Sequence, residues 1–230
     1  MNKYKHLFFD LDRTLWDFEI NSVKTLKLIY KSRKLDHIFP DFESFIDRYK
    51  DHNKRLWDLY KQRKIKKDEL SNKRFWLALN DFGTDDPQLA EKIAQDYIKL
   101  SPQQTTLFPN TIEVLDYLKS RYKMYIITNG FVEVQYKKLR NCGLMQYFTH
   151  ITTSEEAKAS KPNPEIFHSA ISAANAKKTE SLMIGDDLGA DILGAKNFGI
   201  DQVYFNPEAH LHKENITFEI NTLKELMDIL

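Results

Sequence analysis

Two aspartates, Asp10 and Asp12, follow the first apolar run of the chain, residues 4–9. If that run is a buried strand of a parallel sheet, both carboxylates lie at its carboxyl end, where open α/β sheets bind their ligands. The two-residue period of a strand then directs both side chains to the same side. Close carboxylates repel each other, and a hard divalent cation is the simplest way to hold them together. The pair predicts a cation-dependent site, unless one aspartate caps a turn and the other faces solvent.

A second acidic group follows a later apolar run and contains Asp186, Asp187 and Asp191. Carboxylates directly after a buried strand are costly unless a positive charge lies among them. Asp186, nearest the strand, is the predicted metal ligand. Asp187 is the candidate N-cap of the helix that follows. The two acidic groups therefore predict one shared cation at a common edge of the sheet.

Two further signals lie between the acidic groups. Thr128, Asn129 and Gly130 end another apolar run and offer a hydroxyl and backbone amides where a helix is about to start. Such a turn can cradle an anion, although it is also an ordinary strand-to-helix connection. Lys161 precedes Pro162, which fixes an extended backbone and can hold the ammonium at a set position. A lone loop lysine is usually solvated, so this signal has meaning only beside the others.

Composition describes an ordinary globular protein. The 230 residues carry a net charge of +1, which gives no electrostatic reason to expect a nucleic acid polymer or an anionic membrane as partner. Cys142 is the only cysteine, so no disulfide or cysteine-rich zinc site forms within one chain. Neither a signal-peptide pattern nor an apolar segment of about 20 residues is found. We expect a cytoplasmic protein, a monomer or homodimer, that acts on a small molecule.

The pattern of apolar residues changes near residue 101. Before it, residues 16–99 lack convincing strands and predict four helices, of which residues 67–82 are expected to end at Gly83. After it, short apolar runs alternate with helices, which favours βαβ units and a parallel sheet. The expected strands span residues 4–9, 124–127, 148–152, 182–184 and 203–205, and the expected helices span residues 110–121, 131–142, 164–174 and 188–198.

The first strand has nothing else to pair with, so it belongs to the later sheet. The fold class is therefore α/β, with a Rossmann-like parallel sheet core and an inserted α-helical domain. We expect residues 1–15 and 106–230 to form the core that carries the active site. Residues 16–105 are expected to form the helical insertion.

The order of these motifs resembles that of the haloacid dehalogenase superfamily of phosphotransferases over essentially the whole chain. The resemblance implies that Asp10 is the nucleophile that forms an aspartyl-phosphate. It implies that Asp12 is the general acid and then the base, with its backbone carbonyl on the metal. A dehalogenase expels a halide, which needs no proton, so an acid at position 12 favours phosphoryl transfer over dehalogenation.

The same resemblance assigns the remaining site residues. Thr128, Asn129 and Lys161 would hold the phosphoryl group, and Asp186 would complete the ligands to Mg²⁺. Asp187 or Asp191 would support these ligands without touching the ion. A phosphate ester and a carboxylate are both anionic, so a metal and a lysine must offset their repulsion.

Resemblance over shorter stretches indicates a narrower class of substrate. The stretches at residues 12–18, 126–131 and 74–75 resemble the YjjG-type pyrimidine 5′-nucleotidases, which dephosphorylate UMP, dUMP and dTMP. The insertion resembles the cap that excludes water and reads the substrate beyond its phosphate. Trp16 and Phe18 could stack on a base or pack at the hinge, and Arg74 could contact substrate or be a solvated helix arginine. The alternatives are a sugar-phosphate or acylneuraminate-phosphate phosphatase, a phosphomutase, a haloacid dehalogenase, or a silent binding module.

Overall fold

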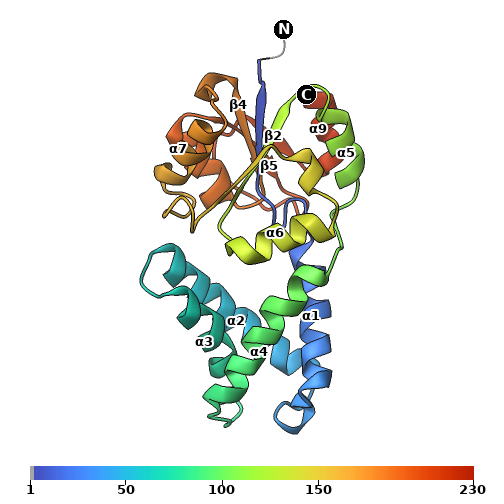
Figure 1. Cartoon of the computed structure of the whole chain (residues 1–230), viewed down its shortest axis with the longest axis vertical. Coiled ribbons are helices and arrows are strands. Elements are labelled where there is room, and N and C mark those ends of the chain that lie inside the picture. The colour runs from blue at the N-terminus through green and yellow to red at the C-terminus, as the bar shows by residue number, and fades with distance from the viewer. Residues whose placement is uncertain (1–2) are drawn as a thin grey trace. The chain divides into compact units, whose positions relative to one another are not determined.

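The computed structural model describes residues 3–230, which divide into two compact units (Figure 1). The first unit comprises the chain up to Phe18 together with Thr105–Leu230, and the second comprises Glu19–Gln104. Among the described residues, no helix combines the length and apolar character needed to cross a membrane.

The first unit is built on a parallel sheet whose strand order is β3-β2-β1-β4-β5-β6. All its strand pairs are parallel. Strand β1 lies between β2 and β4, and the strand order reverses there. Open α/β sheets bind ligands at such a reversal, outside the carboxyl ends of the strands. The strands are β1 (His6–Phe9), β2 (Lys123–Thr128), β3 (His150–Thr153), β4 (Ser181–Gly185), β5 (Asp201–Phe205) and β6 (Phe218–Ile220).

Helices cover both faces of this sheet, as the alternation of side chains along β1 requires. Leu7 and Phe9 belong to the core cluster on one face, which includes residues of α5 (Thr111–Leu118), α6 (Val132–Asn141) and α9 (Leu226–Ile229). Phe8 belongs to the cluster on the other face, with residues of α7 (Pro164–Ala173) and α8 (Gly194–Phe198). Figure 1 shows α7 and α5 on opposite sides of the sheet. The strands are therefore buried on both faces, and only their ends can bear polar groups.

The second unit is entirely helical, and the four predicted helices are confirmed. Asp86 caps the last of them through a bond from the Leu89 amide, with Pro87 at its first position. The preceding helix ends at Asn80, and Gly83 beyond it is left-handed with φ +78°, the conformation expected of a terminating glycine. A core of aromatic and aliphatic side chains from all four helices fills this unit. The helices are α1 (Phe18–Ser32), α2 (Phe42–Lys61), α3 (Lys67–Asn80) and α4 (Pro87–Leu100).

Two local features differ from the predicted elements. Strand β6 was not predicted, because it is only three residues long and a half-exposed Phe218 begins it. The helix predicted over residues 188–198 is split into a π-helical segment, Leu188–Leu193, and α8. At Gly194, a Cβ would lie 3.0 Å from the Phe167 ring and from Pro162 Cα, so this glycine lets α8 approach α7 closely.

Candidate active site

The predicted site residues gather at the carboxyl edge of three neighbouring strands. Asp10 follows β1, Thr128 ends β2, and Asp186 follows β4. The Asp10 amide continues the sheet ladder by donating to the Ile184 carbonyl at 2.9 Å, so β4 fixes where the Asp10 side chain starts. The sheet thus joins residues that lie 176 positions apart in the printed sequence.

Three carboxylates form a tight acidic cluster at this edge. One oxygen each from Asp10, Asp186 and Asp191 lies within 4.8 Å of the others, and Asp10 and Asp191 are buried. Burial, helped by the charge of Asp191 and opposed by Lys161, raises the pKa of Asp10 to about 7. Burial and the charges of Asp10 and Asp191 hold the pKa of Asp186 well above its usual range. Concentrated negative charge on hard oxygen donors is the environment that a divalent cation stabilises.

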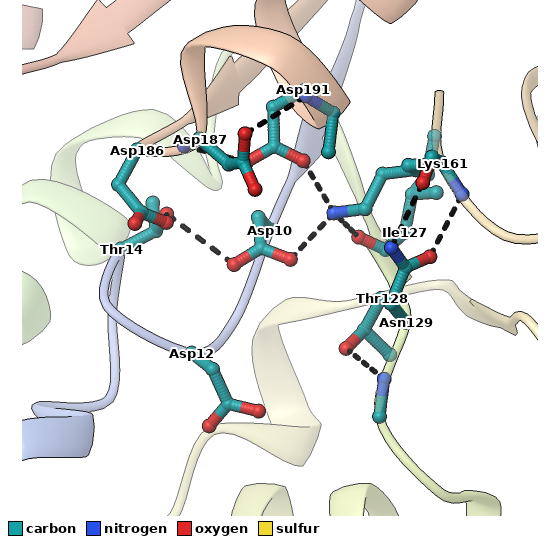
Figure 2. Close-up of polar contacts among 12 residues, drawn as sticks. Asp10, Asp12, Thr14, Ile127, Thr128, Asn129, Lys161, Asp186, Asp187 and Asp191 are labelled. Carbon is teal, nitrogen blue, oxygen red and sulfur yellow. Dashed lines mark hydrogen bonds and ion pairs between the residues drawn. The ribbon is translucent and has the colours of Figure 1, made fainter. Parts of the chain in front are cut away.

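Lys161 supplies the positive charge inside the cluster (Figure 2). Its ammonium lies 2.5 Å from Asp10 Oδ1 and 2.6 Å from Asp191 Oδ1, and it donates to the Ile127 carbonyl at 2.7 Å. Only 2% of the residue is exposed. Burial opposes the charge of this lysine, but Asp10 and Asp191 more than offset it, so its pKa is raised. The side chain is a fixed cation and differs in this from a solvated loop lysine.

The acidic residues Asp187 and Asp191, which follow β4, have different structural roles. Asp187 caps the π-helical segment by accepting from the Gly189 and Ala190 amides, as predicted. Asp191 turns back to Lys161 and also accepts from the Asp187 amide at 3.1 Å. A Cβ at Gly185 would lie 2.4 Å from Asp191 Oδ2, so a glycine at the end of β4 makes room for this carboxylate. Asp191 is therefore a member of the acidic cluster itself. From the sequence alone, we expect it only to support the metal ligands.

Asn129 holds the lysine loop in place. Its side chain accepts from the Lys161 amide at 2.8 Å and donates to the Lys161 carbonyl at 3.1 Å. These paired bonds fasten the loop before α7 to the end of β2 and thereby fix where the Lys161 side chain begins. No pattern in the sequence indicates this pairing, because the two residues are far apart along the chain.

Asp12 does not share the environment of Asp10, although the sequence predicted that both side chains point to the same side. Its carboxylate is directed away from Asp10 (Figure 2) and pairs with Lys138 and Gln135 of α6. Strand alternation stops at the end of β1, where the chain turns and two amides bond to the Leu11 carbonyl. The Asp12 carboxylate is therefore neutralised by a lysine, and the carboxylates of the candidate cation site among the described residues are those of Asp10, Asp186 and Asp191.

Comparisons with known proteins identify the family of the chain. A family model described as haloacid dehalogenase-like hydrolase matches residues 4–199. The chain belongs to this family. It is a hydrolase of the family whose motif order the sequence resembles, and its fold class is confirmed.

Relatives of this hydrolase cover nearly its whole length. The pyrimidine 5′-nucleotidase PynA of Streptococcus pneumoniae is 35% identical over 99% of this chain and 95% of its own. The pyrimidine 5′-nucleotidase YjjG of Escherichia coli is 30% identical over 99% of this chain and 98% of its own. A crystal structure of the HAD-hydrolase YfnB of Bacillus subtilis bound to magnesium aligns with a TM-score of 0.90 at 30% identity, covering 99% of each chain.

Thr14 is an additional residue of the hydrolase site. It is fully buried, and its hydroxyl donates to Asp186 Oδ1 at 3.1 Å and lies 3.5 Å from Asp10 Oδ2. The hydroxyl thereby links the turn after β1 to the carboxylate that follows β4 and lies beside the carboxylate of Asp10. The signal for it in the sequence is a threonine two residues after the Asp-x-Asp pair.

The candidate substrate residues of the hydrolase occupy different environments. Trp16 is fully buried in the core, with the Lys138 ammonium 3.9 Å from its ring centre. Phe18 is partly buried and lies against the Arg13 guanidinium. In the helical unit Arg74 is only 3% exposed and donates to Asn53 Oδ1 at 2.8 Å, so the interpretation of Arg74 as a solvated helix arginine is wrong. Trp16 and Arg74 are both buried, whereas the partly buried Phe18 stays a candidate for substrate contact.

Proposed function

We propose that this hydrolase is a Mg²⁺-dependent phosphomonoesterase that forms an aspartyl-phosphate on Asp10 and acts on pyrimidine nucleoside monophosphates. One observation carries the proposal. The Asp10 carboxylate is buried between a fixed lysine at 2.5 Å and an acidic cluster suited to a divalent cation. A nucleophile that must approach an anionic phosphate needs positive charge on both sides.

The residues fit a magnesium ion. Asp10 and Asp186 would hold it together with the Asp12 backbone carbonyl, and Asp191 would support them while it anchors Lys161. All these donors are oxygens, as Mg²⁺ prefers. When bound, the ion would offset the charge of the phosphoryl oxygens and of the attacking carboxylate.

The proposed reaction has two halves. The phosphoryl group is held by the Thr128 hydroxyl, the Lys161 ammonium and backbone amides at the turn around Asn129. Asp10 attacks phosphorus, the bond to the leaving oxygen breaks, and Asp12 gives that oxygen a proton. Asp12 then takes a proton from water, which attacks the aspartyl-phosphate and releases inorganic phosphate and free Asp10.

The substrate class rests on the relatives named pyrimidine 5′-nucleotidase, which match over nearly the whole chain. The partly buried Phe18 is the proposed contact beyond the phosphate. A panel of UMP, dUMP, dTMP and several sugar phosphates, assayed with Mg²⁺ and with EDTA, tests the assignment. We expect turnover of the pyrimidine nucleotides that EDTA abolishes. Turnover of sugar phosphates alone would replace the substrate class, and inertness toward every ester would refute phosphatase activity.

Replacing Asp12 by asparagine tests the acid. We expect kcat on nucleoside monophosphates to fall by about 10²–10⁴-fold, because a nucleoside alkoxide is a poor leaving group that needs a proton. The loss on p-nitrophenyl phosphate should be much smaller during formation of the aspartyl-phosphate, since nitrophenolate leaves without protonation. Pre-steady-state measurement of nitrophenolate release separates this step from the later hydrolysis. An equal loss on both esters in that step would contradict the acid role.

Magnesium should stabilise the protein more at high pH than at low pH. Without metal, burial raises the pKa of Asp10 from 3.8 to about 7, so the folded state binds its proton more tightly than the unfolded chain does. This carboxyl therefore favours the folded state fully below pH 3.8, and its contribution is lost as the pH rises through 7. Bound Mg²⁺ offsets that loss. We expect a larger rise in Tm on adding Mg²⁺ at pH 8 than at pH 5, and an equal rise at both would contradict it.

A further inference from the structure

Gln135 of α6 joins two residues of the proposed reaction through one amide group. Its Nε2 donates to Asp12 Oδ2 at 2.9 Å and to Thr128 Oγ1 at 2.6 Å. A side-chain amide carries two N–H donors, and both are used here. The side chain is fully buried, so its position is set by packing. One glutamine thus fixes the distance between the candidate acid and the candidate phosphate-binding hydroxyl.

Lys138 holds the other oxygen of the same carboxylate. It lies three residues after Gln135, on the same face of α6, and its ammonium forms an ion pair with Asp12 Oδ1. Only 4% of the residue is exposed, and the ammonium also lies 3.9 Å from the centre of the Trp16 ring. Both oxygens of Asp12 are therefore held from a single helix, which leaves the carboxylate little freedom to rotate.

The bonds to Thr128 determine what its hydroxyl can still do. Thr128 Oγ1 accepts from Gln135 and also from the Gly130 amide at 3.1 Å. A hydroxyl has two acceptor lone pairs and one donor hydrogen, so both acceptor positions are filled. Only donation remains, and a phosphoryl oxygen is an acceptor. Gln135 thereby prepares Thr128 to bind an anion.

Two details argue that Gln135 is present for its donors. Its Oε1 is buried and has no hydrogen-bond partner among the described residues, so the amide satisfies Asp12 and Thr128 at the cost of its own carbonyl. The turn before α6 is also shaped around this side chain. A Cβ at Gly130 would lie 2.4 Å from Gln135 Nε2 and 2.5 Å from its Cδ. Only a glycine at that position lets the glutamine lie against the turn.

We propose that Gln135 and Lys138 are positioning residues for catalysis: Gln135 sets Asp12 and Thr128 in register with each other, and Lys138 fixes the second Asp12 oxygen. The inference rests on the proposed phosphatase function, in which Asp12 protonates the leaving oxygen and Thr128 holds the phosphoryl group. Neither residue contacts substrate in this role. Each acts through the carboxylate or hydroxyl that it holds.

Gln135→Met keeps the volume of the side chain and removes both donors, so it is the informative variant. We expect its kcat on the preferred nucleoside monophosphate to fall by about 10–100-fold, a part of what the acid itself contributes. Nitrophenolate release from p-nitrophenyl phosphate in the pre-steady state should fall by less than about threefold. Lys138→Met should show the same selective loss, and Lys138→Arg should recover part of it because it restores the ion pair.

The double variant Asp12→Asn/Gln135→Met separates positioning from a packing defect. If Gln135 acts mainly through Asp12, the double variant should lose at most about threefold more kcat than Asp12→Asn alone, because residues that work as a unit are non-additive. That remaining loss is the part that Gln135 contributes through Thr128. Full additivity of the two losses would overturn the inference. Lys137→Met, the exposed neighbour on α6, and the exposed Gln146→Ala are matched controls that should keep wild-type rates.

The outcomes distinguish this inference from the function on which it rests. Turnover by the wild type together with unchanged kcat in Gln135→Met would overturn the positioning role and leave the phosphatase function intact. A loss of equal size on both esters would also overturn it, because a disturbed core does not discriminate between leaving groups. A wild type that turns over no ester would overturn the proposed function, and the inference with it.

Discussion

Asp10→Asn is expected to lower kcat by at least about 10³-fold on every phosphate ester, including activated ones. The amide cannot attack phosphorus, so the loss does not depend on the leaving group, which distinguishes this variant from Asp12→Asn. The wild type, quenched in acid during turnover, should carry a covalent phosphate on the peptide that contains Asp10. The variant should carry none. Both results follow if Asp10 is the nucleophile.

The Asp10→Asn variant should keep its fold. Asparagine has almost the same volume and can accept from the Lys161 ammonium, which lies 2.5 Å from the carboxylate. The substitution also removes a buried carboxyl whose pKa is raised to about 7, so the metal-free variant should be at least as stable as the wild type at pH 8. Thermal unfolding at that pH measures this directly. Exposed Asp58→Asn is the control, and wild-type turnover in Asp10→Asn would mean that another residue attacks.

Lys161→Met should produce the second largest loss, about 10²–10³-fold in kcat, because it removes a preorganised positive charge at the phosphoryl group. It should also destabilise the metal-free protein by about 3–5 kcal/mol at pH 8, since the Asp10 and Asp191 carboxylates are left buried without their cation. Kinetics at saturating Mg²⁺ and chemical denaturation with EDTA measure the two effects separately.

The stability loss of Lys161→Met should shrink as the pH falls. Without the ammonium, the carboxylates bind protons more tightly in the folded state, and protonation removes their repulsion. Chemical denaturation at pH 5 and pH 8 therefore measures how the stability loss depends on pH. A loss caused by poorer packing alone would be the same at both pH values. Lys177→Met, at an exposed position, is the control, and wild-type stability of Lys161→Met at pH 8 would contradict the ion-pair assignment.

The sequence predicted the fold well because its signals are local. Apolar runs that alternate with helices predict a parallel sheet, and each helix of the insertion carries its own apolar face, so neither prediction needs long-range information. Element ends were less accurate, as the split helix over residues 188–198 illustrates. Strand β6 was missed because a three-residue strand is decided by its neighbour β5.

Candidate site residues can be named from the sequence where residue type alone indicates chemistry. Asp10 and Asp186 are carboxylates that directly follow apolar runs, and a charge in that position is costly unless it is paired. Lys161 lies in a loop, so its type is informative only beside those carboxylates. The role of Asp187 as a helix cap was predicted for the same reason, because a cap acts within three residues. Neither Gln135 nor the pair of bonds between Asn129 and the Lys161 backbone could be predicted in this way, since neutral amides are common on helices and in turns.

By itself, the sequence determined which residues stand at the ends of strands and therefore which charges meet at the edge of the sheet. Only the tertiary structure decided how those charges pair. It placed Asp191 on Lys161 and separated Asp12 from Asp10, because the chain turns after β1 and α6 brings Lys138 and Gln135 to the second aspartate. The physical reason is range: strand and helix patterns act over a few residues, whereas the pairing of buried charges depends on segments that folding alone brings together.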